Sequence, residues 1–164
     1  MKKYELTTEF KINFFGRKLF RIRALISFGN VNEGDLGGYI EDEKNLSHDG
    51  NAWVYGDAKV YGDAEVCGDA KVYGNAWVCG NAKVCGDADY TTIKGFGRCF
   101  RTTTFFKCKD GLVRVTCGCF YGTIAEFKAK VEQTHGKSKL AIEYLKISEL
   151  MEYHFSAEVE NEKD

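Results

Sequence analysis

The amino-acid sequence predicts a mainly β protein that ends in a pair of α-helices. Three patterns support this class: a six-residue repeat over residues 51–89, alternating apolar and polar residues on both sides of that repeat, and apolar residues at helical spacing after residue 123. The 164 residues carry a net charge of −1 and are 44% hydrophobic, which predicts one compact body with a sizeable core. A net charge so near zero excludes a uniformly basic nucleic-acid binder.

The N-terminal part, residues 1–50, is predicted to form a β-hairpin followed by a capping segment. The stretch YELTTEFKINFFGRKLFRIRAL alternates apolar and polar residues on both sides of Gly16, which is typical of a hairpin. The stretch SFGNVNEGDLGGYIEDEKNLSHDG that follows is rich in glycine and is predicted to lead irregularly into the repeat. We expect both to cover an open end of the repeat, because a stack of repeats needs atypical caps.

The repeat, residues 51–90, is predicted to consist of very short strands. It aligns one column of valines and one column of alanines: Val54, Val60, Val66, Val72, Val78 and Val84, and Ala58, Ala64, Ala70, Ala76, Ala82 and Ala88. A helix of about 3.6 residues per turn would scatter these valines, whereas a strand points residues two apart to the same side. Each Ala-x-Val triplet is therefore predicted to be a strand with Ala and Val inside, and each Gly-Asp or Gly-Asn pair a turn.

This stretch resembles the hexapeptide-repeat proteins, whose aliphatic-x-x-x-small-x pattern builds a left-handed parallel β-helix. The resemblance implies about two coils of about eighteen residues, so that residues i and i+18 stack at the inter-strand spacing of about 4.8 Å. In this register Lys59 stacks on Trp77 and Glu65 on Lys83. The expected fold is thus a short left-handed parallel β-helix, capped by β-hairpins and followed by two helices.

The C-terminal region, residues 91–155, is predicted to form a second β-hairpin and the helix pair. Alternating strands flank residues 109–111, which carry the turn. Thr123 and Glu126 form a capping box at the start of the first helix, and Gly136 ends it.

The second helix is predicted to begin after Ser138, a capping residue. It carries an apolar stripe that is expected to face the core or another subunit: Leu140, Tyr144, Ile147 and Met151. Residues 156–164 are predicted to be an acidic tail.

The order of these modules, including the segments GDLGGYI and VTCGCFYGTIAEF, also resembles small proteins encoded by bacteriophages and prophages. The resemblance implies an accessory protein in the cytoplasm of a bacterial host that binds a host component, such as a defence protein, and disables or sequesters it. The N-terminal stretch MKKYELTTEF lacks the apolar core of a leader peptide, and no apolar run is long enough to span a bilayer. We therefore expect no membrane partner.

Outward positions of the repeat carry aromatic side chains that predict a binding surface. In the eighteen-residue register they form one patch across two faces of the coil: Trp53, Tyr55, Tyr61, Tyr73 and Trp77. A stacked set of aromatic side chains is typical of a contact surface. Its partner is either a host protein or another copy of the chain, and the flanking hairpins could also cover part of it. The resemblance implies a homo-oligomer, with a trimer favoured over a dimer.

Charge is segregated along the chain, which predicts separate basic and acidic surfaces. Seven basic residues lie within residues 2–23 and six within residues 94–114, whereas six acidic residues lie within residues 33–49. These surfaces would suit an anionic ligand or complementary subunits.

The second basic stretch interleaves Lys94, Arg98 and Arg101 with aromatic residues in the segment KGFGRCFR. This pattern predicts, as an alternative function, the binding of a small anionic nucleotide or of nucleic acid. The segment matches only the start of an RNA-binding aromatic motif, because Arg98 and Cys99 stand where that motif has an aromatic residue and a valine. Its phenylalanines are therefore expected mainly in the core and the caps.

A catalytic alternative follows from the resemblance to hexapeptide-repeat proteins, many of which are trimeric acyltransferases with a histidine base. The resemblance implies acyl transfer from acyl-CoA, with His48 as the base because it is the histidine nearest the repeat. His48 would need an orienting partner other than Asp49, since neighbouring residues in a strand point apart. A protein without catalytic activity and without a cofactor is favoured, because two coils leave little wall for a long cofactor.

The odd number of cysteines, 7, predicts free thiols in a reducing compartment. Three of them occupy outward repeat positions and are expected at the surface: Cys67, Cys79 and Cys85. Four others fall near the second hairpin and could together hold zinc: Cys99, Cys108, Cys117 and Cys119. The single residue between Cys117 and Cys119 does not match the usual spacing of about two to four intervening residues, so no metal site is predicted.

Overall fold

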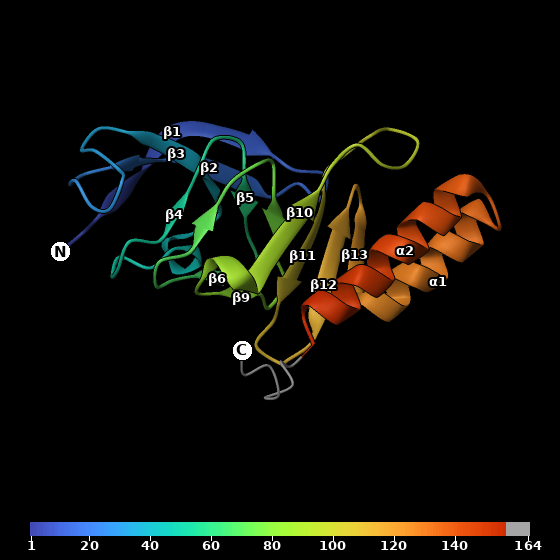
Figure 1. The fold of residues 1–164 in the computed structure, drawn as a ribbon. Helices are drawn as coiled ribbons and strands as arrows, with labels where there is room; N and C mark the ends of the chain where they lie inside the picture. Colours follow the sequence, from blue (N-terminus) through green and yellow to red (C-terminus); the bar gives the residue numbers. More distant parts are fainter. Residues whose placement is uncertain (157–164) are drawn as a thin grey trace, which may run out of the picture.

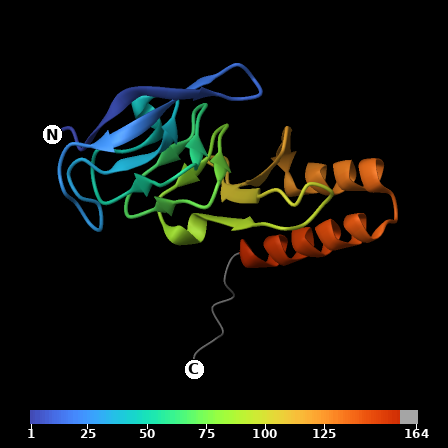
Figure 2. The same cartoon turned by 90° about the horizontal axis from the view of Figure 1, so that it is seen from above.

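The computed structural model describes residues 1–156 of the 164-residue chain, and residues 157–164 of the predicted acidic tail lie outside this part. The described residues form a mainly β structure with two C-terminal helices, as the sequence predicts. Figure 1 and Figure 2 show an N-terminal hairpin, a stack of short strands, a second sheet and a helix pair following one another along the molecule. Within the described residues, no helix has both the length and the apolar composition needed to cross a bilayer.

The predicted N-terminal hairpin is confirmed. Strands β1 (Tyr4–Ile12) and β2 (Lys18–Ala24) pair antiparallel, and the turn between them contains Gly16 at φ 76°, a conformation that glycine adopts without steric cost. The glycine-rich stretch after the hairpin is more regular than expected. Its strand β3 (Leu36–Ile40) pairs antiparallel with β2 and parallel with β5 (Lys59–Val60), so one sheet joins the hairpin to the repeat.

The repeat forms six strands of two residues each, as its period predicts: β4 (Trp53–Val54), β5 (Lys59–Val60), β6 (Glu65–Val66), β7 (Lys71–Val72), β8 (Trp77–Val78) and β9 (Lys83–Val84). The strands pair in parallel, β4 with β7, β5 with β8 and β6 with β9, and each pair joins residues i and i+18. The expected eighteen-residue register is thereby confirmed. The valine of every strand is 0% exposed, so the interior of the repeat is dry and apolar.

The repeat ends one unit earlier than its alanine column suggests. Ala88, expected inside, is exposed and lies in the 3-10 helix η2 (Asp87–Asp89). The backbone N–H of Cys85 donates to the Asp89 carboxylate at 2.9 Å. This local hydrogen bond favours a turn over another strand, and the chain leaves the repeat to enter β10 (Tyr90–Ile93).

Two aromatic residues of the predicted outward patch are instead buried. Trp53 is 1% exposed and Tyr61 is 6% exposed. The Trp53 ring lies 5.4 Å from the Phe28 ring and 6.2 Å from the Tyr4 ring, centroid to centroid, and Tyr61 lies close to Arg17 of the hairpin. The flanking segments cover these faces because a short coil cannot bury enough apolar surface alone.

The expectation of free surface thiols is wrong for three cysteines. Cys67 and Cys85 follow the paired strands β6 and β9 and form a disulfide. They are eighteen residues apart, so the stacking register itself brings their Cα atoms to 4.4 Å, within bridging distance. Cys79 is 4% exposed, and burial raises the pKa of its thiol to about 11.

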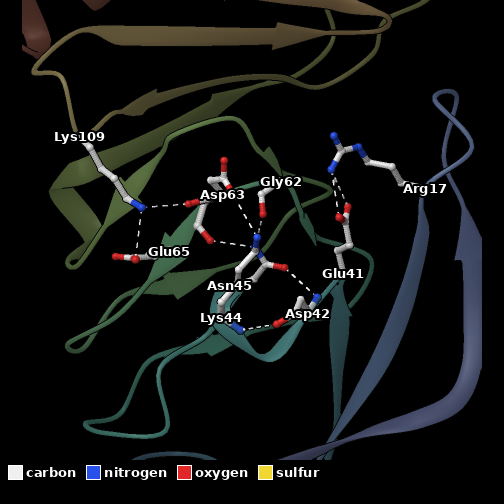
Figure 3. Close-up of polar contacts among 10 residues, drawn as sticks. Arg17, Glu41, Asp42, Lys44, Asn45, Gly62, Asp63, Glu65 and Lys109 are labelled. Carbon is white, nitrogen blue, oxygen red and sulfur yellow. Dashed lines mark hydrogen bonds and ion pairs between the residues drawn. The ribbon is translucent and has the colours of Figure 1, made fainter.

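A buried amide closes the N-terminal end of the repeat (Figure 3). The Asn45 side chain is fully buried and donates to the carbonyls of Gly62 and Ala64, at 3.1 and 2.9 Å. The next residue, Leu46, forms a parallel bridge with Val66. Asn45 therefore satisfies carbonyl groups that would otherwise lack partners at this end.

Lys3 ties the start of the chain to the start of the repeat. It is 2% exposed, and its Nζ donates to the carbonyls of Ala52 at 2.8 Å and Gly50 at 3.3 Å. The same ammonium lies 4.7 Å from the centroid of the Phe28 ring. These contacts satisfy the cation, but burial still disfavours its charged form.

The second sheet has the order β10-β11-β12-β13 and is antiparallel throughout. Its central hairpin, β11 (Thr103–Lys107) and β12 (Val113–Cys117), is the one that the sequence predicts. The flanking strands β10 and β13 (Phe120–Thr123) are additional to that prediction. Helix α1 (Ile124–His135) continues directly from β13.

The predicted helix ends are confirmed, although the Glu126 side chain contacts the Thr123 hydroxyl rather than the backbone N–H that a full capping box uses. The Thr123 hydroxyl accepts from the N–H of Glu126 at the start of α1, Gly136 caps its end, and the Ser138 hydroxyl caps α2 (Lys139–His154). The apolar stripe of α2 faces inward, with its last three members buried: Tyr144, Ile147 and Met151. The stripe therefore belongs to the core rather than to a subunit contact.

Replacing Val66 with Asp should unfold the repeat. The Val66 position is 0% exposed, and an unpaired carboxylate there costs on the order of 3–5 kcal/mol. Thermal unfolding followed by circular dichroism measures the loss, with Tyr73→Asp as the control because Tyr73 is 58% exposed. A Val66→Asp protein that melts like the parent would contradict the inward register.

Lys3 should make the protein more stable as the pH rises from about 8 towards 10. Burial lowers the pKa of Lys3 from 10.5 to about 8 in the folded protein, whereas the unfolded chain keeps a value near 10.5. Between these values the unfolded chain binds more protons, so the free energy of unfolding increases with pH. Cys79, whose pKa burial raises to about 11, contributes in the opposite direction at the upper end of this range. Denaturant titrations should therefore show a free energy of unfolding that changes more favourably with pH in the parent than in Lys3→Met. An identical pH dependence in both proteins would exclude a contribution of Lys3.

Candidate functional site

The loop between β10 and β11, residues 94–102, has an unusual backbone. Gly95 and Gly97 have φ values of 97° and 77°, and Phe100 has φ 52° although it is not a glycine. A left-handed conformation costs such a residue roughly 1–2 kcal/mol, and Phe100 is also 66% exposed. Figure 1 shows that the loop projects beyond the ends of β10 and β11. A strained, exposed aromatic residue in a projecting loop is a reason to look for function nearby.

Tyr144 of α2 forms a hydrogen bond to the backbone of this loop. Its hydroxyl donates to the carbonyl of Phe96 at 3.2 Å, and a side chain at Gly97 would collide with that hydroxyl. Burial, followed by the nearby Cys117, raises the pKa of Tyr144 to about 12, so the hydroxyl stays protonated near neutral pH. A glycine at position 97 therefore lets the helix and the loop approach closely.

Arg101, at the end of the loop, lies across Gly118 in the turn between β12 and β13. A Cβ atom at Gly118 would overlap the Arg101 guanidinium, so this close approach also requires a glycine. The Cys99 thiol lies beside the guanidinium and raises the pKa of Arg101 further. Arg101 is exposed at the surface, and it lines both of the cavities described next.

The first hollow, the helix-side cavity, lies between the loop, the turn after β12 and the two helices. Its volume is about 260 Å³. Four of its lining residues are basic: Arg98, Arg101, Lys130 and His135. Its apolar part includes three aromatic rings, Phe120, Phe127 and Tyr144, and the Phe127 ring lies 5.4 and 5.5 Å from the other two.

The second hollow, the coil-side cavity, lies where the loop meets the repeat and the N-terminal hairpin. Its volume is about 460 Å³, and its cations are Lys59, Lys94 and Arg101. Its aromatic rings are those of Phe14 and Trp77, whose centroids are 5.8 Å apart. Arg101 and Cys99 line both cavities, so the two hollows adjoin each other.

The charge at these cavities is not neutralised within the described chain. Neither lining contains a carboxylate. In residues 1–156, ion pairs involve none of the following cations: Lys59, Lys94, Arg98, Arg101 and Lys130. The linings are therefore suited to an anion.

The basic residues of the N-terminal hairpin behave differently. Arg17 pairs with Glu41 at 3.0 Å, as Figure 3 shows, and Lys2 pairs with Glu43 at 2.9 Å. Three further cations of this stretch pair with Asp57 or with carboxylates of the hairpin itself, so most of the predicted basic surface over residues 2–23 is neutralised. In the second basic stretch, Lys94, Arg98 and Arg101 have no ion pair within residues 1–156, whereas its other three cations do.

The structure divides the binding residues that the sequence predicts. Lys94, Arg98, Arg101 and Trp77 line the two cavities. Tyr55 and Tyr73 lie elsewhere, in edge-to-face contact at 6.4 Å between ring centroids. With Trp53 and Tyr61 buried, the expected single aromatic patch does not form.

Sequence reasoning missed the cavity residues that come from distant elements. Lys130, His135 and Tyr144 lie in α1 and α2, where helical spacing indicates only which residues face the core. Phe14 comes from the tip of the first hairpin. The signal that could have pointed to the site is Gly97, because a glycine outside a regular turn can indicate a close approach, whereas Gly118 lies in a tight turn that would explain a glycine by itself.

His48 lies apart from both cavities, and its ring contacts Lys3, Glu43 and Tyr4. Nδ1 accepts from the backbone N–H of Lys3 at 3.1 Å, which requires the proton of a neutral ring to be on Nε2. Nε2 lies 3.5 Å from the Glu43 carboxylate, and the ring stacks on Tyr4 at 4.2 Å. The neutral ring therefore has no free lone pair with which to act as a base, and these contacts fit a structural role.

The four cysteines near the second hairpin do not converge. Cys99 and Cys117 line the helix-side cavity, whereas Cys108 is buried near Ala82 of the repeat and Cys119 is exposed. Among the described residues, no group of three or more His, Cys, Asp or Glu side chains has the arrangement of a metal site. These cysteines lie in different segments, since Cys108 follows β11 at one end of the hairpin and Cys117 ends β12 at the other.

Comparison with known proteins adds no assignment to this geometry. The sequence matches no protein-family model, and a comparison with curated proteins finds no match.

Replacing Tyr144 with Phe should loosen the loop without unfolding the protein. The change removes a hydroxyl whose hydrogen bond to Phe96 contributes on the order of 1 kcal/mol, which corresponds to roughly a fivefold higher population of the open loop. Limited trypsin digestion, which cuts after Lys94, Arg98 and Arg101, should accelerate by that factor. Tyr153→Phe is the control, since Tyr153 is 80% exposed. Equal cleavage rates in parent and Tyr144→Phe would show that the loop is held by other contacts.

Proposed function

We propose that this protein is a non-catalytic binding protein that holds a small nucleotide in the helix-side cavity. The observation that carries the proposal is the lining itself, which combines four basic residues with three aromatic rings and has no carboxylate. The binding of an anionic nucleotide, an alternative from the sequence, therefore becomes the preferred function. Binding of a host protein through the aromatic face of the repeat has less support, because Trp53 and Tyr61 are buried.

The chemistry of the lining matches the two parts of a nucleotide. Arg98 and Arg101 carry planar guanidinium groups that can each donate two parallel hydrogen bonds to a phosphate, and Lys130 adds a third positive charge. Phe120 is half-buried and offers a ring on which a base can stack, whereas the buried Phe127 and Tyr144 rings pack behind it and form the apolar floor. Phosphate binding supplies most of the affinity in such a site. A simple inorganic anion would contact the cations but not the rings, so it would bind less well than a nucleotide.

The same lining supports binding rather than catalysis. The lining has no Asp or Glu, so it offers neither a carboxylate base nor carboxylate ligands for Mg²⁺, and we assign its one histidine, His135, to phosphate binding with the other basic residues. The acyl transfer implied by the hexapeptide resemblance would need a histidine with a free lone pair, which the contacts of His48 do not provide.

The resemblance to bacteriophage proteins suggests a role for this binding. A phage-encoded protein in the cytoplasm of a bacterial host could counteract a defence component by sequestering the nucleotide on which that component depends. A protein that sequesters a nucleotide must bind it tightly and be abundant, but it does not need to convert the nucleotide. The lining described above fits this role.

We also propose that the repeat is a short left-handed β-helix of the hexapeptide-repeat kind. Its support is the parallel pairing of residues eighteen apart and the inward column of valines. The homo-oligomer that this resemblance implies, with a trimer favoured over a dimer, stays a prediction. Tyr73 is the exposed aromatic residue of the repeat that remains for such a contact.

Isothermal titration with the four nucleoside 5′-monophosphates tests the proposed function. At least one should bind the parent protein, and Arg98→Glu should weaken that binding at least tenfold, because a charge-assisted hydrogen bond contributes roughly 1.5–3 kcal/mol and the new carboxylate repels phosphate. Chromatography should recover the bound nucleotide unchanged.

Lys146→Glu is the matched control for this experiment, because Lys146 is an exposed cation of α2 outside the cavity lining. It should bind like the parent. Absence of binding to all four nucleotides, or equal weakening by both substitutions, would contradict the proposal.

A further inference from the structure

We propose that the helix-side and coil-side cavities together hold one dinucleotide, that is, two nucleoside units joined through phosphate, with the joining phosphate at Arg101. This inference rests on the proposed function and extends it from one nucleotide to two. It starts from the adjacency of the cavities, which share Arg101 and Cys99 as a common wall.

The two cavities repeat the same chemistry on either side of that wall. The helix-side cavity combines Arg98 and Lys130 with the rings of Phe120 and Phe127. The coil-side cavity combines Lys59 and Lys94 with the rings of Phe14 and Trp77. A single nucleotide would use one set of cations and rings and leave the other unoccupied, whereas a dinucleotide offers a base to each cavity and places its joining phosphate between the two sets of cations.

The volumes of the two cavities agree with a ligand that has one unit in each. Ligand cavities are typically roughly 300–1,000 Å³. The helix-side cavity, at about 260 Å³, lies just below that range, and the coil-side cavity, at about 460 Å³, lies in its lower half. Joined across Arg101, they reach the size expected for a ligand of two units.

Hydrogen bonds fix the two cavities relative to each other. The Thr116 hydroxyl of β12 donates to the carbonyl of Trp77 at 2.7 Å, and the N–H of Trp77 donates to the Thr104 hydroxyl of β11 at 3.1 Å. Thr104 and Thr116 are both buried. The strand that carries Trp77 is thereby bound to the sheet that carries the loop, so the spacing between the cavities is set by the fold before any ligand arrives.

Phe14 completes the coil-side cavity from a third part of the chain. It stands at the tip of the first hairpin, is 74% exposed, and reaches the Trp77 ring at 5.8 Å. The two rings are tilted at 48° to each other, and most of the Phe14 side chain remains accessible to a base. Lys59 lies 5.5 Å from the same Trp77 ring, which keeps a cation next to the stacking surface.

Isothermal titration with matched mono- and dinucleotides tests this inference. The probes are the nucleoside 5′-monophosphate that binds best and the 5′-phosphorylated dinucleotide of the same base. The dinucleotide should bind the parent at least roughly tenfold more tightly, because its second unit binds at a high effective concentration. The double variant Phe14→Ala/Lys94→Ala should lose that gain and keep the mononucleotide affinity. Both residues are exposed, so the variant should fold like the parent.

The control variant is Phe15→Ala/Lys137→Ala, which removes an exposed phenylalanine and an exposed lysine outside both linings. It should keep both affinities. The inference is overturned if the parent binds the mononucleotide and the dinucleotide equally, or if Phe14→Ala/Lys94→Ala weakens both to the same degree. In either case the proposed function still stands, whereas it fails if no probe binds.

A third probe separates a free dinucleotide from a nucleic-acid strand. An eight-residue single-stranded oligonucleotide of the same base should bind no more tightly per dinucleotide unit than the dinucleotide itself. A gain of more than tenfold would replace the dinucleotide proposal with a strand-binding surface that continues beyond the two cavities.

Discussion

The stacking of inward valines at an interval of eighteen residues is the constraint on which the rest of the structure depends. It makes a dry column from strands of only two residues each, and such strands have no stability of their own. The column is open at both ends, and its faces carry large side chains such as Trp53. The flanking modules therefore have to cover it, and the way they do so decides which surfaces remain exposed.

That requirement also explains where the cavities lie. At the N-terminal end the cover is tight, because Asn45 and Lys3 satisfy the free carbonyls and Phe28 covers Trp53. On the other side a four-stranded sheet meets the repeat, and Thr116 joins the two through Trp77. The loop between β10 and β11 does not fill the space between the second sheet, the helix pair and the tip of the first hairpin. The two cavities therefore remain there, and the cations of the loop line them.

The sequence predicts the local features well and the long-range ones poorly. A period of six fixes the register and the inward valines, and capping residues such as Thr123 fix helix ends, because both depend on neighbours in the chain. The burial of Trp53 depends on Phe28 and Tyr4, which lie 25 and 49 residues earlier in the chain, and a six-residue period carries no information about them. Lys130 lines the same cavity as Arg101 because α1 packs against the second sheet. The sequence could therefore predict the loop residues of the candidate site but not those of the helices.

The contact between Arg101 and Gly118 links the chemistry of the two positions. Gly118 has φ 60°, a conformation that asparagine also tolerates, so folding alone would not restrict the position to glycine. The guanidinium lying across it adds a second reason for glycine, since any side chain would displace the guanidinium from this place. In an evolving lineage, asparagine at position 118 would therefore be accepted together with a new position of the arginine, whereas a lineage that kept the arginine between the two cavities would keep glycine.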